Sequence, residues 1–340
     1  MFGSEIGIDL GASTVRIYVR GRGIVLREPC VVTRDRGTGE ILETGAAAQR
    51  MLGRTPGSIE ALRPLRDGIA ADPEMTQRLL RAFLARVPVS KLFRPELMLC
   101  VPPQLDGEEA RAVVDAGLRA GAKRVRLIGT TMAAALGAGL EIGRPQGNMV
   151  IDIGGGTTDI AVLTMGEIVE EASVRTAGAS YDGAIAAYLR RQYNLLIGER
   201  TAEELKVGIG CVYPRPEELT AKVRGRCLLT GMPRTVEVTS TELLDAVEEV
   251  TCAILDAIHG VLERTPPELA ADIAANGAVL TGGGCLIWGF AQMLAERTGL
   301  PARIADDAAA CVVCGAGKAL EKPEKYARRD ENPGHAADGK

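Results

Sequence analysis

The stretch Met149-Val-Ile-Asp-Ile-Gly-Gly-Gly-Thr-Thr-Asp159 decides the fold. Its apolar start is typical of a buried strand, and Asp152 follows where that strand ends. Three glycines then form a tight turn, because glycine adopts positive φ and lets a ligand approach the backbone closely. We expect the N–H groups of this turn, with the hydroxyls of Thr157 and Thr158, to wrap a phosphate. Asp152 is then placed to hold a hydrated Mg²⁺ that bridges the phosphates.

The same device recurs in the chain. Near the N-terminus, Ile6-Gly-Ile-Asp-Leu-Gly-Ala-Ser-Thr14 again joins an apolar strand, an Asp, a Gly and small hydroxyl residues. Further on, Val279-Leu-Thr-Gly-Gly-Gly284 places a third glycine turn after an apolar strand. An Asp beside a Gly most often only begins a turn, but the duplication favours a shared ligand. Two such hairpins facing one phosphate chain, with the third turn under the base, predict a nucleotide cleft between two duplicated α/β domains.

Composition and missing motifs exclude several other classes of protein. No Gly-x-x-x-x-Gly-Lys-[Ser/Thr] occurs, which excludes a P-loop, and no Gly-x-Gly-x-x-Gly follows a strand, which excludes a dinucleotide fold. The net charge of −4 and the lack of a basic, aromatic-rich stretch argue against nucleic acid as a partner. No run approaches the roughly 18 apolar residues of a membrane span. No signal peptide opens the sequence, so we expect a cytoplasmic protein.

The eight cysteines stand mostly inside apolar runs, and we expect buried, reduced thiols. Cys311-Val-Val-Cys314 has the C-x-x-C spacing. It has no second pair, and the chain contains only two histidines, so the pattern does not predict a zinc site.

The order of strand-rich and helical segments predicts two domains. The first covers residues 1–146, with a small turn-rich subdomain at about 34–68, and the second covers 147–314, with a small subdomain at about 181–240. A helix at 315–322 returns to the first domain, and the polar tail 323–340 is predicted to be disordered. At the level of helices, the sequence predicts one helix over Ala184–Gln192. Further on, Thr265-Pro-Pro-Glu268 has the spacing of a capping box with Pro at the first helical position.

Beyond these patterns, the chain resembles the MreB/Mbl branch of the actin-superfamily ATPases, from Phe2 to about Glu321. The stretches that carry this resemblance most specifically are Gly21-Arg-Gly-Ile-Val-Leu-Arg-Glu-Pro29, Arg54-Thr-Pro-Gly57, Leu62-Arg-Pro-Leu-Arg-Asp-Gly-Ile69, Tyr193-Asn-Leu-Leu-Ile-Gly-Glu-Arg-Thr-Ala-Glu203, Leu229-Thr-Gly-Met-Pro-Arg-Thr235 and Arg264-Thr-Pro-Pro-Glu-Leu-Ala-Ala-Asp-Ile273. The resemblance implies an actin-like, ribonuclease H-like duplicated α/β fold that binds ATP with Mg²⁺. It also implies head-to-tail, paired filaments at the inner face of the cell membrane, working with cell-wall synthesis to maintain rod shape.

The resemblance also assigns roles around the nucleotide. Glu203 would contact the ribose and Lys206 would flank the adenine. Standing three residues apart on a predicted helix, these two share a face, and without the resemblance a surface ion pair would be the ordinary interpretation. The glycines at 282–284 would let the base lie flat against the backbone.

One departure from the family pattern bears on hydrolysis. Where the family reads Leu-Ile-Glu-Glu-Pro-Met-Ala-Ala-Ala, this chain reads Leu127-Ile-Gly-Thr-Thr-Met-Ala-Ala-Ala135. Thr130 therefore stands in place of the Glu that orients the attacking water, and losing such a base typically costs about 10²–10⁴-fold in rate. Ala12, Ala179 and Cys227 also replace a family hydroxyl and two family carboxylates. We expect nucleotide binding with weak or absent ATPase activity, with Thr157 supporting any slow turnover.

The resemblance places a membrane contact at Leu92-Phe93, an apolar pair between Lys91 and Arg94. An ordinary buried loop pair is the alternative, and Phe2 would add to any membrane contact. Two apolar side chains bind weakly, so stable attachment would need the avidity of a filament.

Three functions therefore stand as hypotheses. They are a membrane-bound filament protein, a non-hydrolysing regulatory paralogue that co-assembles with an active homologue, and, with least support, a small-molecule kinase on the same fold. The predicted site residues are Asp9 and Asp152 for Mg²⁺; Gly11, Ala12, Ser13, Gly154, Gly155, Gly156, Thr157, Glu203, Lys206, Gly282, Gly283 and Gly284 for the nucleotide; Thr130 and Thr157 for hydrolysis; and Leu92 and Phe93 for the membrane.

Overall fold

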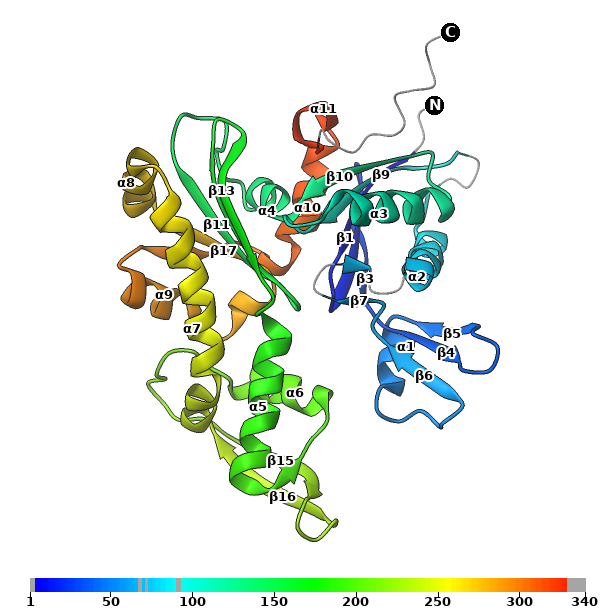
Figure 1. The fold of residues 1–340 in the computed structure, drawn as a ribbon, viewed down its shortest axis with the longest axis vertical. Coiled ribbons are helices and arrows are strands. Elements are labelled where there is room, and N and C mark those ends of the chain that lie inside the picture. Colours follow the sequence, from blue (N-terminus) through cyan, green and yellow to red (C-terminus); the bar gives the residue numbers. More distant parts are fainter. Residues whose placement is uncertain (1–3, 67–68, 71–72, 90–92, 329–340) are drawn as a thin grey trace. The chain divides into compact units, whose positions relative to one another are not determined.

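The structure is a computed structural model, and it describes residues 4–66, 69–70, 73–89 and 93–328. The chain forms two units, drawn in Figure 1. Unit 1 contains residues 1–142 and 309–340, and unit 2 contains residues 143–308. Each unit is built around its own five-stranded sheet and its own apolar core.

The sheet of unit 1 has the strand order β10-β9-β1-β2-β3. These strands are β1 (Glu5–Leu10), β2 (Thr14–Val19), β3 (Gly23–Pro29), β9 (Glu96–Val101) and β10 (Arg124–Gly129). β9 runs parallel to both β1 and β10, whereas β1, β2 and β3 are joined by antiparallel hairpins. The central strand β1 is buried from Ile6 to Leu10, as a strand covered on both faces should be. In β2, buried and half-buried residues alternate.

Helices cover this sheet. α2 (Pro73–Arg86) and α3 (Gly107–Arg119) supply Leu79, Phe83 and Val113 to its apolar core. α4 (Thr130–Gly137) packs against α10 (Cys311–Ala319). These two helices approach backbone to backbone, because a Cβ on Gly137 would lie only 1.8 Å from the carbonyl oxygen of Cys311. Small residues along both helices make that approach possible.

Unit 1 also has a smaller part and a short C-terminal helix. The strands β4 (Val32–Asp35), β5 (Ile41–Thr44) and β6 (Ile59–Leu62) form a three-stranded sheet beside α1 (Ala46–Met51), and β7 (Leu65–Arg66) pairs with β8 (Ile69–Ala70). The helical turn α11 (Pro323–Tyr326) occupies part of the tail that the sequence predicts to be disordered. It is held there by an ion pair between Glu324 and Arg126. Residues 329–340 of that predicted tail lie outside the described residues.

Unit 2 repeats the arrangement of the first sheet. Its strand order is β13-β12-β11-β17-β18, from β11 (Asn148–Ile153), β12 (Thr158–Thr164), β13 (Glu167–Val174), β17 (Ala278–Thr281) and β18 (Ala302–Ile304). β11, β17 and β18 are parallel, and β11, β12 and β13 are joined by antiparallel hairpins. The core lies between this sheet and helices such as α5 (Gly178–Tyr193), α7 (Ser240–Arg264), α8 (Pro267–Asn276) and α9 (Phe290–Thr298).

The smaller part of unit 2 lies at one end of α5 (Figure 1). Its three strands are β14 (Leu195–Leu196), β15 (Thr220–Cys227) and β16 (Pro233–Thr239), with α6 (Glu199–Ile209) beside them. Val223, Val236 and Val238 point into the core of unit 2, and the alternate residues of β15 and β16 are exposed. One face of this hairpin is therefore apolar and packed, and the other faces solvent.

Two details of the helix ends differ from the sequence patterns. α5 begins at Gly178, six residues before the apolar spacing alone would start it, because its first turn bonds to a glycine turn described below. The predicted capping box at Thr265 is wrong. The Thr265 hydroxyl donates to the Val261 carbonyl of the preceding helix, 2.8 Å away, and α8 is capped by Pro266 without a side-chain bond.

The eight cysteines are all free thiols, and six of them are buried. Cys311 and Cys314 both lie on α10, where Cys311 is part of the contact with α4. No group of three or more metal-ligating side chains occurs among the described residues.

Candidate nucleotide site

The first Asp-x-Gly turn joins β1 to β2 in unit 1. Asp9 is only 9% exposed, and its Oδ2 lies 3.3 Å from Nη1 of Arg16, its partner across the hairpin. Burial raises the pKa of the Asp9 carboxyl, and the Arg16 guanidinium partly opposes that rise. A Cβ on Gly11 would lie 2.7 Å from the Thr14 carbonyl oxygen, so this turn requires glycine. The turn thus holds a buried acid near the carboxyl end of the central strand, beside the Arg16 guanidinium.

Ala12 and Ser13 complete this turn and are half-buried. The Ser13 carbonyl accepts a hydrogen bond of 2.9 Å from the N–H of Cys30, which ties the turn to the segment after β3.

Thr130 lies at the same end of the parallel strands as Asp9. β1, β9 and β10 are parallel and in register at Asp9, Cys100 and Ile128, so their carboxyl ends meet, and α4 begins with Thr130 directly after β10. The Thr130 hydroxyl donates to the Val101 carbonyl oxygen, 2.8 Å away. The position is thus occupied by a neutral group whose proton is already engaged with the backbone.

In unit 2, Asp152 occupies the position that corresponds to Asp9. It is 6% exposed, in register with Thr281 on the parallel strand β17, and its Oδ1 accepts a 2.7 Å hydrogen bond from the Thr281 hydroxyl. Neither Thr281 nor Arg16 was predicted from the sequence as a partner of these acids. The signals were present: Thr281 immediately precedes a glycine turn, and Arg16 mirrors Asp9 across a short hairpin.

The glycine turn after Asp152 is fixed by the start of α5. The N–H of Gly154 donates to the Thr157 carbonyl, 2.9 Å away, which closes the turn. The carbonyls of Gly154 and Gly155 accept from the N–H groups of Gly178 and Ala179, at 3.1 and 2.8 Å. Ala179, which replaces a family Asp, therefore keeps its backbone place beside the turn but brings no carboxylate.

The two threonines after this turn have different roles. Thr158 is fully buried, and its hydroxyl donates to the Thr176 carbonyl oxygen 2.6 Å away, so the expectation that it wraps a phosphate is wrong. Thr157 is half-buried, and its hydroxyl lies 3.4 Å from Asp159 Oδ2. Of the two hydroxyls, only that of Thr157 is placed to meet a ligand at the turn.

Lys206 lies against the same turn. Its Nζ donates to the Gly178 carbonyl oxygen at 2.9 Å and pairs with Asp182 Oδ1 at 2.8 Å. Burial raises the pKa of the Asp182 carboxyl, Lys206 opposes that rise, and the nearby Glu203 adds to it. The predicted pair Glu203 and Lys206 is therefore not a simple surface ion pair, because Lys206 is bonded to α5 and both lie near a third charged group, Asp182.

The third glycine turn packs directly on the end of β11. Gly282 has a φ of +82°, and a Cβ there would lie 2.2 Å from the Ile153 carbonyl oxygen. A Cβ on Gly284 would lie 2.5 Å from Ile153 Cγ2 and 3.1 Å from the Gly154 carbonyl oxygen. These two glycines are needed for packing between the turns. Gly283, by contrast, is exposed with open space around it, and it alone offers a free backbone surface.

Cys227 does not lie on the strands that lead into the glycine turns. It ends β15 in the small sheet β14-β15-β16, whereas the glycine turns belong to the ends of β11 and β17. Hydrogen bonds from Thr230 and from the backbone N–H of Leu229 hold the pKa of its thiol at about 7. The thiol thus caps the β15–β16 turn, and the expectation that its presence removes a carboxylate from the nucleotide site is wrong.

The predicted membrane pair is only partly visible. Leu92 lies outside the described residues, as does Phe2, while Phe93 is 46% exposed. No helix in the described residues is long and apolar enough to cross a membrane.

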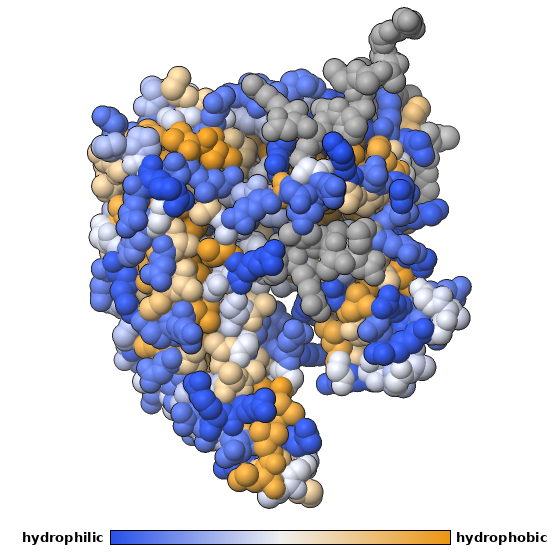
Figure 2. All heavy atoms as spheres, in the orientation of Figure 1, coloured by the Kyte–Doolittle hydropathy of each residue, from blue (hydrophilic) through white to orange (hydrophobic). Residues whose placement is uncertain are grey.

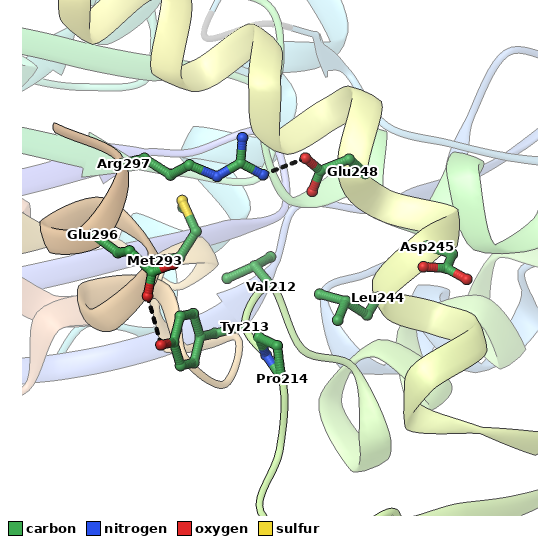
Figure 3. A pocket seen from close by; sticks show the side chains of 9 residues that line it. All are labelled: Val212, Tyr213, Pro214, Leu244, Asp245, Glu248, Met293, Glu296 and Arg297. Atoms are coloured by element: carbon green, nitrogen blue, oxygen red, sulfur yellow. Dashed lines mark hydrogen bonds and ion pairs between the residues drawn. The ribbon is translucent and has the colours of Figure 1, made fainter.

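A separate pocket of about 300 Å³ lies in unit 2 between α7, α9 and the segment Val212–Pro214 (Figure 3). Its acidic side chains are largely engaged with their neighbours. Tyr213 donates to Glu296 over 2.6 Å, and Arg297 pairs with Glu248. None of the predicted nucleotide-binding residues lines this pocket.

Two five-stranded sheets, each with a buried Asp and a glycine turn at the ends of parallel strands, define the class of the fold. Among solved structures it is similar to MreB5 of Spiroplasma citri, with a TM-score of 0.91 and 36% identity to the ADP-bound form, covering 95% of this chain and 97% of that one. The MamK filament has a TM-score of 0.80 at 20% identity, over 94% of this chain and 99% of that one. The fold is therefore actin-like.

The family follows from the sequence relatives. The family model of the MreB/Mbl protein matches residues 3–328. Cell shape-determining protein Mbl of Bacillus cereus is 48% identical, over 97% of this chain and 99% of its own. Cell shape-determining protein MreB of Escherichia coli K12 is 45% identical, over 94% of each chain. The chain belongs to the MreB/Mbl family.

Proposed function

We propose that the chain is a nucleotide-binding actin homologue that assembles into filaments and serves cell shape. One observation carries the proposal: in each unit a buried Asp on the central strand leads into a glycine-containing turn and an antiparallel strand. In support, MreB5 of Spiroplasma citri has been solved with ADP and with AMPPNP, at 36% and 35% identity to this chain. The Mbl and MreB relatives are named as cell shape-determining proteins.

We infer that the nucleotide is ATP and that it binds with Mg²⁺. Mg²⁺ keeps several waters and usually takes only one or two carboxylates besides phosphate oxygens. Asp9 and Asp152 are buried carboxylates of this kind, each held by a hydrogen-bond donor, Arg16 or Thr281. When bound, the ion would neutralise phosphate charge, and the backbone of each turn would orient phosphate oxygens. In unit 2, Lys206 fixes the start of α5 beside the turn.

We propose further that hydrolysis is weak. Thr130 is neutral, and its hydroxyl donates to the Val101 carbonyl, so it can accept a hydrogen bond from water but not a proton. Ala179 supplies no carboxylate beside the turn of unit 2. These two positions also favour the second candidate function, a non-hydrolysing paralogue that co-assembles with an active homologue.

We propose head-to-tail, paired filaments at the inner face of the cell membrane, working with the machinery of cell-wall synthesis. A head-to-tail contact is heterologous and need not close on itself, so one pair of patches can build a filament. Phe93, as an exposed aromatic side chain, supports a membrane contact at the predicted site.

Thermal unfolding with and without Mg-ATP, read beside sedimentation, tests the nucleotide and filament proposals. Asp152→Asn removes the charge while keeping the size of the side chain, and should abolish most of the nucleotide-induced rise in unfolding temperature. Asp245→Asn, an exposed acid on α7, is the matched control and should leave that rise intact. A wild type that shows no nucleotide-dependent shift and no sedimentation would contradict both proposals.

A further inference from the structure

Arg16 brings a cation to the buried acid of unit 1. It stands on β2 directly opposite Asp9 on β1, and residues opposite each other in an antiparallel pair project from the same face of the sheet. Nη1 of Arg16 lies 3.3 Å from Oδ2 of Asp9, and the two side chains are 18% and 12% exposed. The guanidinium therefore lies near the carboxyl end of β1, where the turn of residues 11–13 begins.

The contact with Asp9 leaves most of this guanidinium unused. An Arg side chain carries five N–H donors in a planar fork, and a well-placed carboxylate accepts two of them in parallel. Here one pair of atoms is joined, and Arg16 forms no other hydrogen bond or ion pair within the part of the chain that the structure describes. Unbonded donors of a charged group are costly to enclose, because they lose water without gaining another partner. An anion at the turn would satisfy them.

A second cation lies near the same turn. Burial raises the pKa of the Cys30 thiol to about 12, Arg63 opposes that rise and Asp9 adds to it, so both charged groups lie within electrostatic reach of Cys30. The N–H of Cys30 in turn bonds to the Ser13 carbonyl. Nη1 of Arg63 is enclosed and has no hydrogen-bond partner among the residues that the structure describes. Two guanidinium groups thus stand against one carboxylate here, and this positive balance favours an anion.

We propose that Arg16 binds the phosphate groups of the nucleotide directly and shares their neutralisation with Mg²⁺. Asp9 then has a second task besides its proposed place at the metal ion, because it holds the guanidinium toward the turn. A guanidinium matches phosphate oxygens in geometry and charge, and its hydrogen bonds to them are charge-assisted. The inference rests on the nucleotide site proposed above, and it adds that affinity for the nucleotide depends on Mg²⁺ only in part.

Isothermal titration calorimetry of the full-length protein with ATP, in Mg²⁺ and in EDTA, tests the proposal below the concentration at which the protein sediments. We expect wild type to bind ATP in both buffers. Arg16→Gln should weaken binding about tenfold or more in EDTA, because it removes a charge-assisted hydrogen bond, and by less in Mg²⁺. Arg16→Lys keeps the charge and should recover part of the loss. Arg20→Gln is the matched control and should bind as wild type does, because Arg20 pairs with Glu5 at the opposite end of the same hairpin.

The results separate this inference from the function on which it rests. A wild type that binds no nucleotide in either buffer would contradict the proposed function, and the inference with it. A wild type that binds ATP in Mg²⁺ but not in EDTA would overturn the inference alone, and this result needs no variant. Equal affinities of wild type and Arg16→Gln in EDTA would also overturn it. A lower denaturation midpoint of that variant would then assign Arg16 a purely structural role in the hairpin.

Discussion

Both predicted metal-binding Asp residues accept from a neighbouring side chain on the same sheet. Asp9 pairs with Arg16, and Asp152 accepts from Thr281. A buried carboxylate lowers the free energy of unfolding of the ligand-free protein. Residues that lower stability in this way are typical of functional sites.

Replacing Asp9 with Asn should therefore separate stability from function. Burial raises the pKa of the Asp9 carboxyl in the folded state, so its ionised form disfavours folding at neutral pH. We expect Asp9→Asn to leave the free energy of unfolding unchanged or to raise it by about 1 kcal/mol. Chemical denaturation without ligand measures this. The same variant should lose most of its stabilisation by Mg-ATP, and a variant that is much less stable without ligand would contradict this view.

Cys227 gives a prediction about pH. The pKa of its thiol is lowered from 9.0 to about 7 by hydrogen bonds from Thr230 and Leu229. A lowered folded-state pKa stabilises the fold at pH values above the unfolded pKa, and this contribution is lost as the pH falls through about 7. Wild type should therefore exceed Cys227→Ser in stability by more at pH 9 than at pH 6. Equal differences at the two pH values would show that the thiolate has no such role.

Residue patterns predicted the acids and turns of the site but not how their side chains are used. The motif that places Thr157 and Thr158 after the glycines cannot tell which of them faces the turn, because strand β12 begins between them. In the structure, the Thr158 hydroxyl donates a hydrogen bond to the Thr176 carbonyl oxygen. The lowered pKa of Cys227 depends likewise on a turn that the sequence pattern did not indicate.

At the scale of elements, the apolar runs before the three glycine turns correctly predicted the strands β1, β11 and β17, because a short apolar run bounded by a turn is typical of a buried strand. The ends were harder to predict. α5 begins early because its first N–H groups bond to Gly154 and Gly155, which are more than twenty residues earlier in the sequence. Thr265 has a better acceptor in the preceding helix than the cap its spacing predicts.

The contact between α4 and α10 gives a prediction at this scale. A Cβ on Gly137 would meet the Cys311 backbone at 1.8 Å, so Gly137→Ala must push the two helices apart and should cost about 1–3 kcal/mol of stability. Gly183, inside α5, has open space where the methyl group of an alanine would lie, and it serves as the matched control. Gly183→Ala should stabilise the protein by about 0.5–1 kcal/mol. Denaturant midpoints of the two variants measure both effects, and equal effects would contradict the packing argument.

For the whole molecule, the duplicated sequence device corresponds to a duplicated architecture. In both sheets the central strand has a parallel neighbour on one side and an antiparallel neighbour on the other, and the buried acid lies near the carboxyl end of that central strand. The sequence could not have predicted that Leu228, Leu229 and Met232 are exposed (Figure 2), because they look like core residues until the turn between β15 and β16 is known.

Whether position 130 limits hydrolysis can be measured as phosphate release from Mg-ATP by wild type, Thr130→Glu and Thr130→Gln, with sedimentation read from the same samples. We expect wild type to sediment with nucleotide but to release phosphate slowly, and Thr130→Glu to raise the rate about 10²-fold or more. Thr130→Gln matches Glu in size but cannot take a proton, and should remain slow. Rapid release by the wild type, or equal rates in all three proteins, would contradict the account, because position 130 would then not limit hydrolysis.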